Sequence, residues 1–347
     1  MLRLLTSGES HGPGLTAILD GFPAGVPVAK KFIDAELARR QQGYGRGNRQ
    51  KIEKDEVKIL SGIRHGLSLG SPITLFMENK DHKNWVEIMS ADPVKNKIDQ
   101  VTKLRPGHAD YAGVVKYDFA DLRNVLERSS ARMTAAQVAI GAVCKQFLDN
   151  FKIKIASKVL RVGGAEAKLL KQKIDEAKKN GDTLGGVVEL IIRGVPVGLG
   201  SYVQPDRKLD GRLAGALMSL QSVKGVEIGL GFAAAALPGS KVQDEIFYKN
   251  SKVFHKTNNA GGIEGGMSNG EDIIVRLAFK PIPTLMQPLN TIDWKTKKPT
   301  TAHVERADTC AVEAGAVVAE NIAAFIMADT FLEKFGGDSL AEIKRRV

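Results

Sequence analysis

Hydrophobic residues recur at helical spacing in several stretches of the chain, and we predict a helix for each. In the first stretch Ile33 and Leu37 lie one turn apart, and Arg39 and Arg40 follow near its end. A later stretch is full of Lys and Glu, which predicts a solvent-facing helix, and the last one is long and rich in Ala. The predicted helices span residues 29–42, 129–150, 164–179, 208–220 and 309–333.

Two continuous apolar runs, residues 185–196 and 270–281, predict strands. Because helices do not alternate regularly with strands, the pattern favours an α+β fold with antiparallel sheets over a doubly wound parallel sheet. The segments "RSSARMTAAQVAIGAV" and "RADTCAVEAGAVVAEN" each begin with an arginine and hydroxyl side chains and continue as a helix of small residues. This parallel predicts two similar halves around a shared core.

Composition narrows the class of protein. The formal net charge is +11 and the pI about 9.5, which favours an acidic partner: nucleic acid, an anionic membrane or a small polyanionic ligand. Only two cysteines occur, and both read as buried reduced thiols rather than a disulfide framework or a zinc set. The N-terminus lacks the apolar segment of a signal peptide. The last predicted helix carries Glu313, Glu320 and Asp329, so we interpret it as a buried helix, not a membrane span, and expect a cytoplasmic protein.

Arginines gather beside glycines and serines rather than among aromatic residues. Arginine grips carboxylate and phosphate through two parallel hydrogen bonds, which lysine cannot do. A nucleic-acid-binding protein would interleave its basic residues with aromatics, whereas only Tyr44 lies within the first cluster. The pattern favours a small polyanionic ligand, with nucleic-acid binding as the alternative. The clustered residues are Arg39, Arg40, Arg46, Arg49, Arg105, Arg123, Arg128, Arg132 and Arg306.

Two motifs allow either a binding or a plain structural interpretation. In "RSSAR", Ser129 and Ser130 precede a predicted helix, where they can form an anion site with Arg128 or simply cap the helix. The glycine-rich segment 258–270 can let backbone approach a flat ligand or can be a flexible loop. It matches neither the dinucleotide fingerprint nor the P-loop.

Two histidines have similar surroundings. The motif "GESHG" places Glu9, Ser10 and His11 between two glycines, and His108 lies between Gly107 and Ala109. Small neighbours and nearby arginines suit a role in proton transfer, and a purely structural role is the alternative. Because no His or Cys pair has metal-ligand spacing, we expect no metal site.

Taken in order, the motifs "GESHG", "RRQQGYGRGNR", "RPGHADYAG", "RSSAR", "VKGVEIGLGF", "NNAGGIEGGMSNGE", "KPIPT" and "RADTCAV" resemble the signature blocks of the chorismate synthase family. The resemblance covers residues 1–330. It implies a single catalytic domain over residues 1–347, built as a sandwich of antiparallel β-sheets around a helical core, and a homotetramer. It also implies a lyase that converts 5-enolpyruvylshikimate 3-phosphate to chorismate by 1,4-anti elimination of phosphate, with reduced FMN and no net redox change.

The resemblance implies roles for individual residues. His11 is expected to be the general acid that protonates the departing phosphate. Ser10 and Asp308 are expected to handle the proton at flavin N5, and His108 to lie near flavin N1. Neighbouring arginines favour a neutral His11 and bound dianions a protonated one, which the sequence leaves open. Glu9 receives no role.

Binding residues are carried over in the same way. The resemblance implies FMN contacts from Arg128, Ser129, Ser130, Gln221, Ser222, Gly265, Lys280, Pro281, Ile282, Pro283, Thr284 and Arg306. It implies substrate contacts from Arg39, Arg46, Arg49, Arg105 and Arg132, and links Arg40 and Arg46 to NADP. NADPH is expected only if the chain is bifunctional; its length favours the monofunctional type, which receives reduced FMN from an external flavin reductase.

The chain departs from the family pattern at two positions. Met133 stands where Glu is usual, and Ala307 where His or Ser is common. The rival interpretations are a nucleic-acid-binding protein, a flavoprotein of another reaction class such as a flavin reductase, and a homologue that has lost its activity. Neither a membrane nor a nucleic-acid partner is expected for the favoured interpretation.

Overall fold

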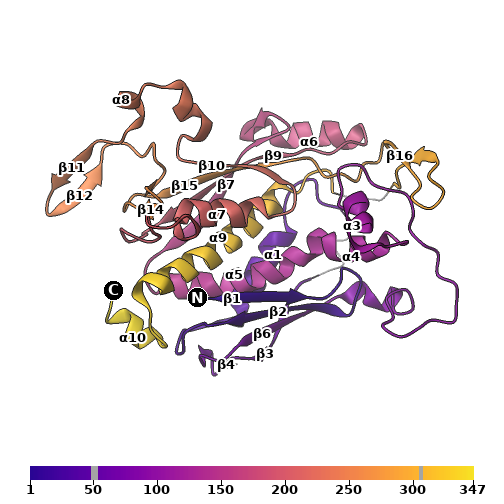
Figure 1. The fold of residues 1–347 in the computed structure, drawn as a ribbon, viewed down its shortest axis with the longest axis horizontal. Helices are drawn as coiled ribbons and strands as arrows, with labels where there is room; N and C mark the ends of the chain where they lie inside the picture. The colour runs from indigo at the N-terminus through magenta and orange to yellow at the C-terminus, as the bar shows by residue number, and fades with distance from the viewer. Residues whose placement is uncertain (48–53, 305–307) are drawn as a thin grey trace.

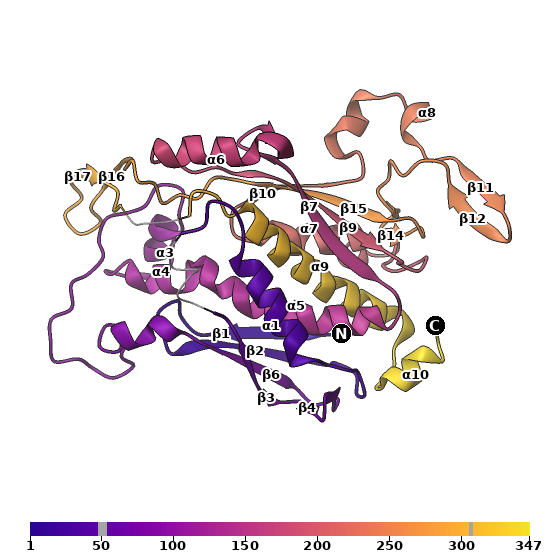
Figure 2. The same ribbon diagram turned by 180° about the vertical axis from the view of Figure 1, so that it is seen from behind.

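Two antiparallel sheets enclose a layer of helices (Figures 1 and 2). The structure is a computed structural model that describes residues 1–47, 54–304 and 308–347. The first sheet has the order β1-β2-β6-β3, from β1 (Arg3–Ser7), β2 (Gly14–Asp20), β6 (Ile73–Glu78) and β3 (Val57–Ser61). The second has the order β10-β15-β9-β7-β8, from β10 (Val223–Ile228), β15 (Ile273–Phe279), β9 (Gly186–Arg193), β7 (Lys154–Val162) and β8 (Ala165–Glu166).

The helical layer consists of α1 (Lys30–Gln41), α5 (Thr134–Asp149), α7 (Leu209–Met218) and α9 (Val312–Phe335). Helix α5 packs on β2 and β6 of the first sheet, α9 packs on β7 and β9 of the second, and the two helices pack on each other. Helix α6 (Leu170–Lys179) covers the outer face of the second sheet (Figure 1). The predicted antiparallel α+β sandwich around a helical core is confirmed.

The contact between α5 and α9 is close at Gly141. A Cβ atom at this position would lie 2.3 Å from the Cβ and the carbonyl oxygen of Asn321, so no larger residue fits without moving a helix. Helix α9 is long and apolar enough to cross a membrane, but 83% of its most apolar window is buried inside the protein. It is therefore the core helix that its polar residues predicted.

The two sheets and their helices repeat one topology. The order β1-β2-β6-β3 matches β7-β9-β15-β10, with α1 and α7, and α5 and α9, at equivalent places in the chain. Even small hairpins recur: β4 (Ile63–Arg64) with β5 (Leu67–Ser68), and β13 (Ile263–Glu264) with β14 (Met267–Ser268). These repeats confirm the predicted two similar halves.

Hydrogen bonds at the repeated hairpins match atom for atom. Ser68 Oγ donates to the Pro23 carbonyl at 2.6 Å and accepts from the backbone N–H that follows Gly25 at 2.9 Å. Ser268 Oγ donates to the Pro196 carbonyl at 2.6 Å and accepts from the N–H that follows Gly198 at 2.8 Å. The repetition therefore extends from topology to local side-chain chemistry.

Two predicted helix starts are wrong. The helix predicted over 129–150 begins at Thr134, after α4 (Arg123–Ser129) and a short turn, η2 (Ala131–Met133). Ser129 Oγ donates to the Val125 carbonyl at 2.8 Å, and Ser130 Oγ accepts from the Arg132 N–H at 3.2 Å. These hydroxyls compete with the helical backbone and break the helix in two. The helix predicted over 164–179 begins at Leu170, after β8 and η3 (Ala167–Leu169).

Two connections meet at one end of the sandwich. Between β6 and α5 lie η1 (Lys80–Asn84), α3 (Asp110–Tyr117) and α4, and between β15 and α9 lies the hairpin of β16 (Asn290–Ile292) and β17 (Pro299–Thr301). Thr102 Oγ1 donates to Asp293 Oδ2 at 2.6 Å, which joins the two connections. They build the outer wall of a large cavity.

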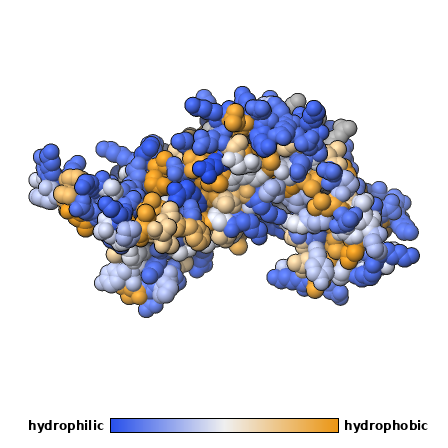
Figure 3. Space-filling view, turned by 90° about the horizontal axis from the view of Figure 1, so that it is seen from above, coloured by the Kyte–Doolittle hydropathy of each residue, from blue (hydrophilic) through white to orange (hydrophobic). Residues whose placement is uncertain are grey.

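An arm extends from the opposite end of the molecule (Figure 1). It comprises η5 (Gly231–Ala236), α8 (Gly239–Val242) and the hairpin of β11 (Ile246–Lys249) and β12 (Lys252–His255). Two further short helices in the described ranges are η4 (Pro205–Arg207) and α10 (Leu340–Lys344). Seen from above, the surface is largely hydrophilic, with separate hydrophobic clusters, some at the end that carries the arm (Figure 3).

Candidate active site

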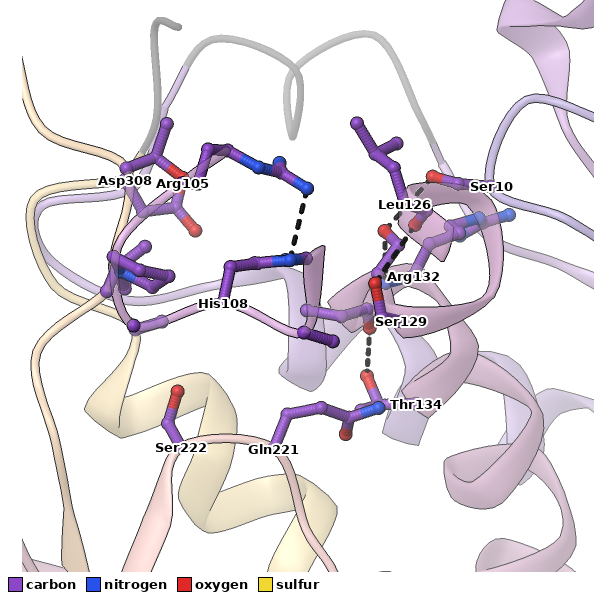
Figure 4. Close-up of a pocket in the computed structure, with 18 of the residues that line it drawn as sticks. Ser10, Arg105, His108, Leu126, Ser129, Arg132, Thr134, Gln221, Ser222 and Asp308 are labelled. Atoms are coloured by element: carbon purple, nitrogen blue, oxygen red, sulfur yellow. Dashed lines mark hydrogen bonds between the residues drawn. The ribbon is translucent and has the colours of Figure 1, made fainter. Parts of the chain in front are cut away.

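A cavity of about 1040 Å³ opens where equivalent ends of the two halves converge. Its walls come from the β1–β2 turn, the segment after α1, the starts of α5 and α9, and the connections after β6 and β15. Ligand pockets measure roughly 300–1,000 Å³, so this cavity lies at the upper end of that range. Figure 4 shows residues from both halves around it.

The turn between β1 and β2 is partly buried and is held by hydrogen bonds. Gly8 has a φ of +101°, and a Cβ there would lie 2.2 Å from the Gly14 carbonyl oxygen, so the turn needs glycine. Asn79 Nδ2 donates to the carbonyls of Glu9 and Gly12 at 3.0 and 2.7 Å. Ser10 is 1% exposed. The turn therefore presents fixed side chains to the cavity.

Ser10 and His11 both line the cavity, each with a partner from the α4 region. The hydroxyls of Ser10 and Ser130 are 3.0 Å apart. His11 Nδ1 lies 2.8 Å from Glu127 Oε1, and the His11 backbone N–H donates to Glu127 Oε2, also at 2.8 Å. The turn and helix α4 thus form one hydrogen-bonded unit.

A buried carboxylate holds two arginines of the cavity wall. Asp55 accepts from Arg40 Nη2 at 2.7 Å and from Arg132 Nη1 at 2.6 Å, and Arg132 Nε donates to Asn79 Oδ1 at 2.9 Å. Burial alone would raise the pKa of the Asp55 carboxyl, but the charges and hydrogen bonds of both arginines outweigh it and hold that pKa below its ordinary value. The guanidinium groups are therefore fixed before any ligand binds.

Asp110 does the same for Arg105 and His108. It accepts from Arg105 Nε and Nη2, each at 2.8 Å, and its Oδ1 lies 2.7 Å from His108 Nδ1. Burial opposes ionisation here too, but hydrogen bonds from Arg105 and His108 bring the pKa of Asp110 well below its ordinary value. On the same side in Figure 4, Asp308 pairs with Arg46 at 3.0 Å and accepts from the Gly47 N–H.

Several guanidinium nitrogen atoms of the wall are buried without a hydrogen-bond acceptor among the described residues. They are Arg40 Nε, Arg46 Nε, Arg123 Nε and Arg132 Nη2. A buried unpaired charged donor is costly, so these atoms mark places where an acceptor from a ligand fits. The donor set suits phosphate and carboxylate groups and, therefore, a phosphorylated cofactor.

The opposite wall, from the second half, is mostly apolar. Leu184, Phe279 and Val318 line it, with the small residues Ala314 and Gly315 at the start of α9. Polar groups are few on this side and include Gln221 and Ser222 (Figure 4). A flat ring can lie against such a wall while its polar substituents reach the arginines.

The structure brings most of the predicted residues into the cavity wall. These are Ser10, His11, Arg40, Arg46, Arg105, His108, Ser129, Ser130, Arg132, Gln221, Ser222, Lys280, Ile282, Pro283, Thr284 and Asp308. Ser10 and Asp308 lie on opposite sides of it in Figure 4. Pro281 lies between two lining residues. Arg49, Arg306 and Ala307 lie outside the described residues.

Three predicted contacts are not brought to the cavity of this chain. Arg39 instead pairs with Glu36 at 2.6 Å and Glu320 at 3.0 Å on the helical layer. Arg128 donates to the carbonyls of Thr6 and Gly8 at 2.7 and 2.9 Å. Gly265 lies in the β13–β14 hairpin. The helical phase of α1 explains the first: Arg40, not its neighbour, faces the cavity.

Sequence reasoning missed residues that complete the site. Trp85 packs on His11 with ring centroids 4.0 Å apart, and the Arg123 guanidinium lies 5.1 Å from the Trp85 ring. Glu127 and Asp110 orient the two histidines. One signal could have identified Glu127: it lies one helical turn after Arg123 and just before "RSS". Nothing in the sequence indicated that Trp85 or Asp55 belongs to the site.

Comparisons with known proteins agree along the whole chain. The family model described as chorismate synthase matches residues 2–332. A chorismate synthase of Geobacter sulfurreducens is 53% identical over 99% of this chain and 97% of its own length. One of Thermoanaerobacter pseudethanolicus is 55% identical over the same shares.

A solved structure shows the same fold. The crystal structure entitled "Crystal Structure of Chorismate Synthase" superposes with a TM-score of 0.80 at 42% identity, covering 99% of this chain and 96% of its own. Sequence, fold and the cationic cavity point the same way. The chain belongs to the chorismate synthase family of lyases.

Proposed function

We propose that this chain converts 5-enolpyruvylshikimate 3-phosphate to chorismate and phosphate by 1,4-anti elimination, with reduced FMN bound beside the substrate and no net redox change. The observation that carries the proposal is the set of buried, unpartnered guanidinium atoms in the cavity wall. The substrate brings two carboxylates and a phosphate, and FMN brings another phosphate. These anions supply the acceptors that the wall lacks.

The first half would bind the substrate's anions. Arg46, Arg105 and Arg132 line the cavity with their guanidinium groups fixed by Asp308, Asp110 and Asp55. Such preorganised donors stabilise charge that develops on a leaving phosphate without reorganising during the reaction. Because Arg40 shares Asp55 with Arg132, it would belong to the same anion-binding wall.

The second half would seat the flavin. Its apolar wall, Gln221, Ser222, the 280–284 segment and, from the first half, Ser129 and Ser130 are the cavity residues proposed to contact FMN. Reduced FMN, when bound, would supply the electron density for C–O cleavage and the base for the C–H proton. Lys280 donates to the Gly107 carbonyl, which joins this segment to the loop of His108.

Proton handling falls to four side chains of the cavity wall. His11 would protonate the departing phosphate oxygen, and a positioned general acid accelerates such a step by roughly 10²–10⁴-fold. Ser10 and Asp308, on opposite sides of the cavity, would relay the proton released from the flavin. His108 would lie at the flavin, where its imidazole, held by Asp110, can stabilise negative charge.

We further propose that residues 1–347 act as a single catalytic domain within a cytoplasmic homotetramer, and that a separate flavin reductase supplies reduced FMN. An intrinsic NADPH-dependent reductase activity, with Arg40 and Arg46 contacting NADPH, is the alternative.

The test is an anaerobic assay of the purified chain with photoreduced FMN and 5-enolpyruvylshikimate 3-phosphate. We expect phosphate and chorismate to appear only when both are present. NADPH oxidation without the substrate would favour a flavin reductase. Tight, salt-dependent binding to random DNA together with poor binding of reduced FMN would favour a nucleic-acid-binding protein. Binding of both ligands without turnover would indicate an inactive homologue.

A further inference from the structure

Glu127 is buried against His11 and contacts both its ring and its backbone. The residue is 3% exposed, and its two carboxylate oxygens each lie 2.8 Å from a nitrogen of His11, one in the ring and one in the backbone. Ionised carboxylate oxygens accept hydrogen bonds and do not donate them. The ring nitrogen next to Glu127, Nδ1, must therefore carry a proton.

The surroundings of the pair keep this geometry fixed. Trp85 covers one face of the His11 ring at 4.0 Å between centroids, and His82 Nδ1 lies 2.9 Å from the His11 carbonyl. Arg123 Nη1 lies 3.9 Å from Glu127 Oε1 and forms an ion pair with it on the same helix. These contacts restrict rotation of the His11 ring.

We propose that Glu127 is a positioning residue that fixes the tautomer of His11, so that Nδ1 stays protonated and all proton exchange with the bound ligand passes through Nε2. This inference rests on the proposed function, in which His11 protonates the departing phosphate. In that step the Nε2–H bond breaks and an O–H bond forms on the phosphate, leaving a neutral ring with its remaining proton on Nδ1. Glu127 gains no proton; it stabilises the imidazolium before transfer.

The variant Glu127→Gln separates this role from a structural one. Its amide oxygen can still accept from the His11 backbone N–H, so the turn keeps that contact. Its amide nitrogen, however, would donate to Nδ1 and move the ring proton to Nε2. The matched control is Glu9→Gln. It makes the same charge change, but at an exposed side chain of the turn that carries His11, and this side chain lies outside the cavity wall.

The first measurement is ¹⁵N NMR of the His11 ring above pH 9, without ligands, where an ordinary histidine, with a pKa of about 6.5, is neutral. We expect the Nδ1–H tautomer in the unmodified chain and in Glu9→Gln, and the Nε2–H tautomer in Glu127→Gln. An Nε2–H tautomer in the unmodified chain would overturn the proposal without any variant. So would an unchanged tautomer in a folded Glu127→Gln.

The second measurement is turnover with reduced FMN. Glu127→Gln should lose roughly 10²–10⁴-fold in kcat, as expected when a general acid is mispositioned, with KM changed less than threefold or so and Glu9→Gln near the unmodified rate. A normal kcat in Glu127→Gln would overturn the positioning role. If the tautomers behave as expected but the unmodified chain releases no phosphate, the proposed function fails while the Glu127–His11 assignment stands.

Discussion

The two halves of the molecule share a scaffold but not a chemistry. Both present the connection between their first two long strands and the start of their last long helix to the cavity. Among the described residues, every arginine in the cavity wall comes from the first half, residues 1–149. The second half contributes mainly apolar and small side chains; its polar lining residues are Gln221, Ser222, Lys280, Thr284, His303 and Asp308. The repeated hairpins show that the scaffold is retained where it only supports the fold.

In the proposed function, the site is divided between a wall that binds anions and a wall that holds the flavin ring. Buried carboxylates hold the cationic groups of the first half in place. Asp55 binds Arg40 and Arg132. Asp110 binds Arg105 and His108. The second half has no comparable buried cluster at the cavity within the ranges described. Variants in the two halves should therefore affect different ligands.

The largest expected effect is on turnover, in the first half. His11→Ala should lower kcat by roughly 10²–10⁴-fold and leave FMN affinity nearly intact, because the side chain is proposed to act on the phosphate. Stopped-flow turnover and anaerobic FMN titration measure the two quantities. Equal losses in both would break the division between the walls.

Next in size is the stability that Asp55 provides. The pKa of Asp55 is lowered in the folded protein, so its ionised form stabilises the fold above the unfolded value of about 3.9, and this stability is lost as pH falls through the folded pKa. We expect the free energy of unfolding to fall below about pH 4. Asp55→Asn should cost about 3–5 kcal/mol at pH 7, since it leaves buried arginines uncompensated, and should flatten the acid loss.

Urea unfolding between pH 3 and 7 measures both the acid loss of stability and the cost of Asp55→Asn. The control is Asp99→Asn, at an exposed residue. An equally steep acid loss in Asp55→Asn would show that other carboxyls dominate.

A smaller effect is expected on substrate affinity. Arg132→Lys keeps the charge but removes the Nη2 atom that lacks an acceptor. Losing one charged hydrogen bond costs about 1.5–3 kcal/mol, so KM for the substrate should rise roughly 10- to 100-fold with little change in FMN affinity. The control is Arg207→Lys, a surface residue of the second half that pairs with Glu333 at 2.7 Å. If Arg132→Lys lowered FMN affinity instead, FMN would contact the wall from the first half, which contradicts the proposed division.

The smallest effect sharpens the comparison from the second half. Ser222 has a φ of 72°, a conformation that glycine adopts more easily, and it lines the cavity. Ser222→Gly should raise the free energy of unfolding by up to about 1 kcal/mol and, by removing a proposed flavin contact, weaken FMN binding two- to tenfold or so. Ser251→Gly, at a φ of 60° in the arm, should share the first effect only. Unchanged FMN binding in Ser222→Gly would remove this residue from the flavin site.

Periodicity predicted the helices and strands that have strong patterns. Helix α1 and strands β9 and β15 begin and end within a few residues of the expected positions. The N-terminal strands were missed because β1 has only five residues and a glycine-rich turn interrupts the apolar pattern between β1 and β2. Helix α5 begins later than predicted because the hydroxyls of Ser129 and Ser130 bond to nearby backbone groups, which ends α4 and starts a separate turn. Hydrophobic spacing does not reveal this local competition.

For the site, motifs identified which residues gather but not how they are held. The choice between Arg39 and Arg40 depends on the phase of α1 against the cavity, which neighbouring residues in a sequence do not reveal. Asp55 and Trp85 come from segments without a motif, and their partners lie far away in the chain. Long-range pairing of this kind requires coordinates.

The carboxylates behind the arginines have a consequence for product release in the proposed reaction. A wall of bare cations would retain inorganic phosphate and the dicarboxylate product long after the bond had broken. Because Asp55, Asp110 and Asp308 each offset part of that charge, the wall can attract a highly charged ligand yet let its two smaller fragments leave.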